Sequence, residues 1–61
     1  MISLEGNEVV IPLEDFTVRI PVAQINTPAR LQRWSREPIG WLTAELSDQL
    51  WHFCAITFEW H

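Results

Sequence analysis

Three residues near the C-terminus could take part in chemistry: His52, Cys54 and His61. Imidazole nitrogens and thiolate sulfur are ligands that zinc prefers, and residues 52 and 54 would share one face of a strand. A structural zinc site uses four ligands, however, and this set offers three. A buried cysteine beside two partly exposed histidines is the simpler interpretation. The sequence therefore predicts no metal site and no cofactor.

The same cysteine and histidine could also be drawn as a nucleophile and its general base. Such a pair needs a third group that orients the base and a cleft that holds the substrate. The residues around Cys54 and His52 identify neither. We therefore expect a protein that is not an enzyme and has no catalytic residues.

The cysteine count and the distribution of apolar residues bear on location. A single cysteine cannot form an intrachain disulfide, which is typical of a reducing compartment. The chain shows neither a signal-like start nor an apolar stretch of membrane-spanning length. We expect a cytoplasmic protein that does not enter the membrane.

The charge balance points to a particular kind of partner. Eight acidic residues stand against four arginines, and the formal net charge is -4 at pH 7. This sign disfavours direct binding to a nucleic-acid backbone and favours a protein partner with a basic surface, itself a nucleic-acid-binding protein. The arginines at 30, 33 and 36 are interpreted as the solvated side of an amphipathic helix. The carboxylates assigned to contact with the partner are Glu14, Asp15, Glu37, Glu45, Asp48 and Glu59, and the alternative is that they form an ordinary solvated surface.

Aromatic residues are unusually frequent, with four tryptophans and three phenylalanines in 61 residues. Each can bury about 150 to 250 Å², so together they exceed what one small core encloses and an exposed apolar patch is expected. Phe16 and Trp34 occupy positions where we expect burial. Trp41 follows a glycine and Trp60 lies near the C-terminus, so we expect these two to contact the partner.

The N-terminal third has the pattern of strands. Gly6-Asn7 is a two-residue turn signal between the β-prone segments 2–5 and 8–13, which predicts a hairpin. Apolar residues then alternate with polar ones from 16 to 22, which predicts a third, half-buried strand.

Two helix starts follow. Thr27-Pro28 predicts a helix through residues 29–36, ended by Pro38, and Thr43 can cap a second helix over 44–50.

Residues 51–60 fit two periods, because alternation favours a strand while Leu42, Leu46, Leu50, Phe53 and Cys54 continue a helical stripe. We prefer a closing strand, since Ile, Thr, Phe and Trp are strand formers. The chain is thus expected to form a single α+β domain over residues 1–61. Its small antiparallel sheet, with three N-terminal strands and one C-terminal strand, would pack against two short helices.

A family resemblance covers about residues 5 to 41. The residues that carry it form the patterns Val9-x-Ile11-Pro12-Leu13-x-x-Phe16, Thr27-Pro28 followed by Trp34, and Gly40-Trp41. These patterns resemble a family of small bacterial domains of unknown function. The resemblance implies a compact α+β module that occurs alone, beside toxin-like partners as an antitoxin, or attached to helix-turn-helix domains. The family's acidic Leu-Asp-x-Asp ending has only a loose counterpart here, at residues 42–48.

Taken together, these observations predict a small acidic binding protein that inhibits a nucleic-acid-handling protein or complex by occupying its surface. Antitoxins and phage-encoded anti-defence inhibitors of the anti-CRISPR kind act in this way. The alternative is a small structural subunit whose exposed tryptophans join it to copies of itself, as a homo-oligomer, or to a larger assembly.

Overall fold

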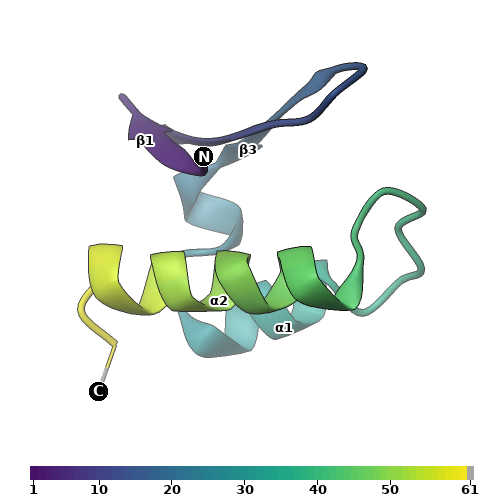
Figure 1. The fold of residues 1–61 in the computed structure, drawn as a ribbon. Coiled ribbons are helices and arrows are strands. Elements are labelled where there is room, and N and C mark those ends of the chain that lie inside the picture. The colour runs from purple at the N-terminus through teal and green to yellow at the C-terminus, as the bar shows by residue number, and fades with distance from the viewer. Residues whose placement is uncertain (61) are drawn as a thin grey trace.

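A three-stranded sheet lies over two helices in the computed structural model, which describes residues 1–60 (Figure 1). The sheet and the helices form two layers, so the chain has an α+β fold. In chain order the elements are β1 (Ser3–Glu5), β2 (Glu8–Pro12), β3 (Thr17–Pro21), the 3-10 turn η1 (Val22–Gln24), α1 (Pro28–Trp34) and α2 (Ala44–Thr57).

The sheet is an antiparallel meander in the order β1-β2-β3, as expected for these three strands. The first turn is the predicted one, because Gly6 has a φ of 58°, a conformation that glycine adopts without steric cost. In the central strand Val9 lies opposite Ile20, and Val10 lies opposite Arg19. Successive side chains of a strand point to opposite faces, so Val9 faces the core while Val10 lies on the outer face.

Helix α1 begins where the sequence predicts. The hydroxyl Oγ1 of Thr27 accepts a hydrogen bond from the backbone N–H of Arg30 at 3.1 Å, and Pro28 occupies the first turn. Proline loses no hydrogen bond there, because that N–H has no partner inside a helix. The helix ends at Trp34, two residues earlier than expected.

The expected C-terminal strand is wrong, because residues 51–57 continue α2 as one helix of 14 residues. Thr43 caps the helix as predicted, through a 3.1 Å hydrogen bond from the backbone N–H of Leu46 to Oγ1. Burial then follows the helical period: Leu50 and Cys54 are buried, four residues apart, while Ile56 is 79% exposed. A strand would have placed Cys54 and Ile56 on the same face. When the helix continues, the backbone groups of residues 51–57 form hydrogen bonds within the helix, and this outweighs their local strand propensity.

Helix α2 ends in a Schellman motif. The backbone N–H of Trp60 donates to the carbonyl of Ala55 at 2.9 Å, and that of Glu59 donates to Ile56 at 3.4 Å. Glu59 has a φ of 54°, in the left-handed region where glycine is usual. This turn reverses the chain and brings Trp60 back onto the core.

The core forms where the sheet meets the helices. It contains Val9, Ile11, Ile20, Ile25, Leu31, Leu50 and Cys54, so the sheet, the link after η1 and both helices all contribute. Trp60 fastens the C-terminal segment to this core, since its indole N–H donates a 2.9 Å hydrogen bond to the carbonyl of Asn26.

Candidate functional site

Three segments meet at the end of the molecule where α2 begins: the tip of the β2–β3 hairpin, the loop over residues 35–43 and the first two turns of α2 (Figure 1). The rings of Phe16 and Trp41 pack edge to face, with centroids 6.5 Å apart, and join the hairpin to the loop. An open pocket of about 260 Å³ lies between Leu13 of the hairpin and Glu45 of the helix. We call this region the acidic end, after its carboxylates Glu14, Asp15, Glu37, Glu45 and Asp48.

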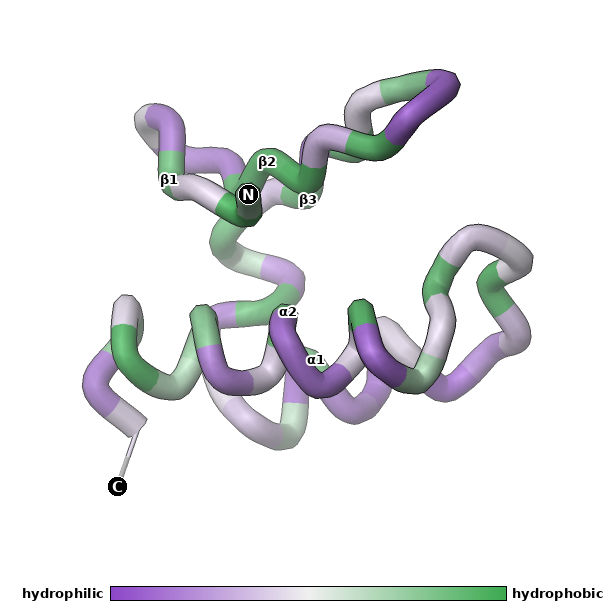
Figure 2. Tube along the Cα trace, viewed as in Figure 1, coloured by the Kyte–Doolittle hydropathy of each residue, from purple (hydrophilic) through white to green (hydrophobic). Residues whose placement is uncertain are grey.

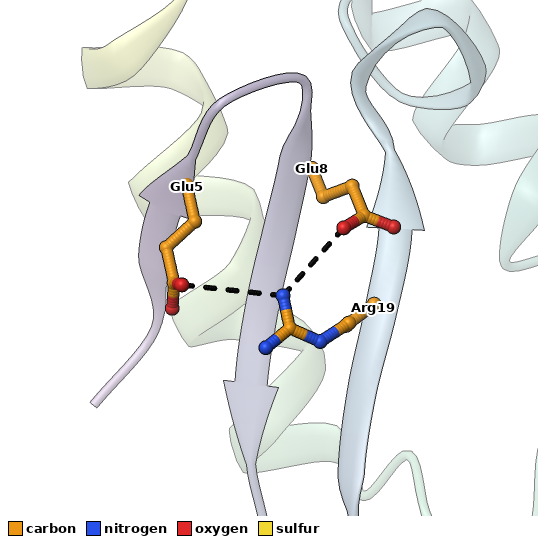
Figure 3. A network of polar contacts seen from close by, with 3 residues as sticks. All are labelled: Glu5, Glu8 and Arg19. Carbon is orange, nitrogen blue, oxygen red and sulfur yellow. Dashed lines mark ion pairs between the residues drawn. The ribbon is translucent and has the colours of Figure 1, made fainter.

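The carboxylates of the acidic end are all exposed. Figure 2 shows a hydrophilic stretch at the hairpin tip, in the sheet layer above the start of α2. Within residues 1–60, the ion pairs of the chain are those of Arg19, with Glu8 at 3.5 Å and Glu5 at 4.0 Å (Figure 3). None of the five carboxylates of the acidic end forms an ion pair within residues 1–60, and Arg36, beside Glu37 in the 35–43 loop, is the one arginine among these three segments, so the acidic end carries an excess of negative charge.

Glu59 lies apart from the other expected carboxylates. It follows α2, while the acidic end lies at the start of that helix, and a 14-residue helix is about 21 Å long. The structure thus brings five of the six predicted carboxylates to one end and leaves Glu59 at the other.

The two tryptophans expected at the interface are both half-buried and pack on the core. Trp41 lies against Trp34, with ring centroids 6.1 Å apart, as well as against Phe16. Trp60 lies against Trp51 at 5.2 Å. Trp41 belongs to the acidic end, whereas Trp60 lies with the C-terminal turn of α2.

Phe16 differs from the expectation of burial, since it is 48% exposed. It lies in the link between β2 and β3, where its ring packs edge to face against Trp41. The neighbouring residues Glu14 and Asp15 could have indicated this exposure, because a residue beside an acidic turn stays near solvent. Trp51 is also exposed, at 42%, because it lies at the edge of the buried face of α2.

The structure does not bring Cys54 and His52 together as a nucleophile and its base or as metal ligands. Cys54 is fully buried, and burial raises the pKa of its thiol from 9.0 to about 11. A neutral thiol is neither a good nucleophile nor a metal ligand. His52 is exposed on the other side of the helix. The residues described, 1 to 60, contain no cluster of three or more metal-ligating side chains, and His61 lies outside them.

No protein-family model matches this sequence, and searches of curated proteins and of solved structures found no match. The resemblance to a family of small bacterial domains therefore stays a prediction. In the part of the chain that the structure describes, no helix combines the length and the apolar character needed to cross a bilayer.

Proposed function

We propose that this protein is a non-enzymatic binding protein of the cytoplasm that inhibits a nucleic-acid-handling protein or complex by occupying its basic surface. An antitoxin or a phage-encoded anti-CRISPR-like inhibitor acts in this manner. The observation that supports the proposal is the acidic end: five exposed carboxylates from three segments, none in an ion pair within residues 1–60.

The physical basis is complementarity of charge. Carboxylates held at one end of so small a molecule repel one another, and a cationic surface relieves this repulsion when it binds. A surface that binds a nucleic-acid backbone has the required sign, so the protein would compete with nucleic acid for it. Phe16 and Trp41 provide the apolar contact beside these charges, and buried aromatic residues carry much of the energy of protein interfaces.

The first test compares two variants with the same change in charge. Glu14→Gln combined with Asp15→Asn removes two charges from the acidic end. Glu5→Gln combined with Glu8→Gln removes two charges from the carboxylates that pair with Arg19. Immobilised wild-type protein and both variants are used to capture partners from an extract of the native host.

We expect the hairpin-tip variant to lose most of the captured protein, while the strand variant retains it. The captured protein should bind nucleic acid, nucleic acid should compete for its capture, and capture should weaken as salt rises, because salt screens exposed charges over about 10 Å at 0.1 M. Equal capture by both variants would contradict the role of the acidic end. Capture that is independent of salt would contradict the electrostatic mechanism.

The second candidate function, a structural subunit, is favoured by apolar residues on α2. Ile56 is 79% exposed and Trp51 is 42% exposed, and both would be covered in an assembly. Sedimentation of the purified chain separates the two candidates. A stable symmetric oligomer at micromolar concentration favours the structural subunit, whereas a monomer favours the inhibitor.

A further inference from the structure

A basic pocket lies between η1 and α1, and one of its walls, Trp34, packs against Trp41 of the acidic end. Its open volume is about 470 Å³, within the range of small-molecule sites, and its walls are Ala23, Gln24, Arg30, Arg33 and Trp34. Two arginines, an amide and an indole thus converge on one pocket in a chain whose net charge is -4.

Arg30 is held in place at this pocket. Its Nη1 donates to the carbonyl of Ala23 at 2.9 Å and to Oδ1 of Asn26 at 3.2 Å. Neither acceptor is a carboxylate, so these contacts supply no counter-charge, and the Nε and Nη2 donors are left for a ligand. A guanidinium fixed in this way loses little freedom when it binds an oxyanion.

Arg33 follows one turn later on α1, and neither arginine forms an ion pair within residues 1–60. Like charges three residues apart on a helix are destabilising. An anion shared between the two guanidinium groups would remove this repulsion, and arginine donors match the geometry of phosphate oxygens. Arg19, in contrast, already has two carboxylate neighbours.

We propose that this pocket binds a nucleoside monophosphate, with the phosphate at Arg30 and Arg33 and the base against Trp34. The half-buried indole provides an aromatic surface, on which a base stacks, and the amide of Gln24 provides a donor and an acceptor for the base. The ligand is a free nucleotide and not a strand, because an acidic protein repels a long polyanion. This site does not depend on the acidic end, and its failure would leave the proposed function untouched.

The test is an NMR titration of the full-length ¹⁵N-labelled chain with AMP, in which the four indole N–H signals are observed separately. AMP should shift the Trp34 indole signal most strongly. Inorganic phosphate and adenosine, titrated separately, should each bind at least about tenfold more weakly than AMP, since each makes only one half of the contacts.

Arg33→Gln should weaken AMP binding at least about tenfold, the effect of losing a charge-assisted hydrogen bond. Arg36→Gln is the matched control, because it removes the same charge from a residue that lines a neighbouring pocket and not this one. It should weaken binding by less than about threefold, as expected for an exposed, screened charge.

Three results would overturn the proposal. The first is an absence of shifts at Trp34 with millimolar AMP. The second is an equal loss of affinity in the Arg33 and Arg36 variants, which would indicate a diffuse electrostatic effect. The third is binding of a short single-stranded oligonucleotide by a chain that does not bind AMP.

Discussion

Ile56→Ala tests the arrangement of α2, because the exposure of this side chain separates a helix from the strand that the sequence favoured. In the structure Ile56 is 79% exposed, so about a fifth of its surface is removed from water. Burying an isoleucine side chain completely contributes up to about 3 kcal/mol, and a fifth of this is about 0.6 kcal/mol. Alanine recovers a few tenths of a kcal/mol through its higher helix propensity. The net loss in the free energy of unfolding should therefore be below about 0.5 kcal/mol.

Leu50→Ala is the matched control, since it shortens another branched aliphatic side chain on the same helix. Leu50 is 1% exposed, and its truncation should cost about 2 to 5 kcal/mol because a cavity remains. That is a large part of the roughly 3 to 9 kcal/mol expected for a domain of this length.

The assay is urea unfolding at 25 °C, followed by tryptophan fluorescence and by far-ultraviolet circular dichroism, with the slope m compared between variants. A loss above about 1.5 kcal/mol in Ile56→Ala, with m unchanged, would mean that Ile56 is buried together with Cys54, as in a strand, and would refute the helical arrangement.

Three further predictions concern the C-terminal segment and the buried thiol. Trp60→Phe should lower the free energy of unfolding by about 1 to 2 kcal/mol, because the partly buried carbonyl of Asn26 loses its donor, whereas Trp51→Phe should cost less; urea unfolding compares the two. Glu59→Gly should raise the free energy of unfolding by about 0.5 to 1 kcal/mol, since glycine adopts the positive φ without strain; a lower midpoint in thermal unfolding would contradict this. The free energy of unfolding should fall by at most about 3 kcal/mol as the pH rises from about 9 to about 11. In this window the unfolded chain releases the Cys54 proton while the folded chain retains it. In Cys54→Ala this part of the pH dependence should disappear.

Local signals in the sequence predicted much of the fold. The turn at Gly6-Asn7 was predicted because few residues tolerate its backbone angles. Both helix starts were predicted because Thr27 and Thr43 satisfy backbone donors three residues ahead, which needs no distant contact. The helical structure of residues 51–57 was not predicted, because the apolar residues of the segment 51–60 fit two periods and strand propensity is only a weak preference.

The exposed aromatic residues show a second limit. Hydrophobicity alone favoured burial of Phe16, yet the side chain is 48% exposed, because its burial depends on which distant segments pack against the hairpin tip, and Trp41 is the aromatic residue that packs on its ring. Trp60 is half-buried because the left-handed residue Glu59 turns the chain back onto the core, and its contact with a partner stays a prediction. Neither outcome follows from the neighbouring residues alone.

By itself, then, the sequence determined the excess of carboxylates, the three N-terminal strands and the two capped helix starts, because charge, turn geometry and capping depend on residue type and near neighbours. Only the tertiary structure decided which carboxylates share one end and which arginines share one pocket. The hairpin tip, the 35–43 loop and the start of α2 are distant in the chain and meet through packing such as that of Phe16 on Trp41. Side-chain packing between distant segments carries no local signature, and this is why these sites emerge only from the folded chain.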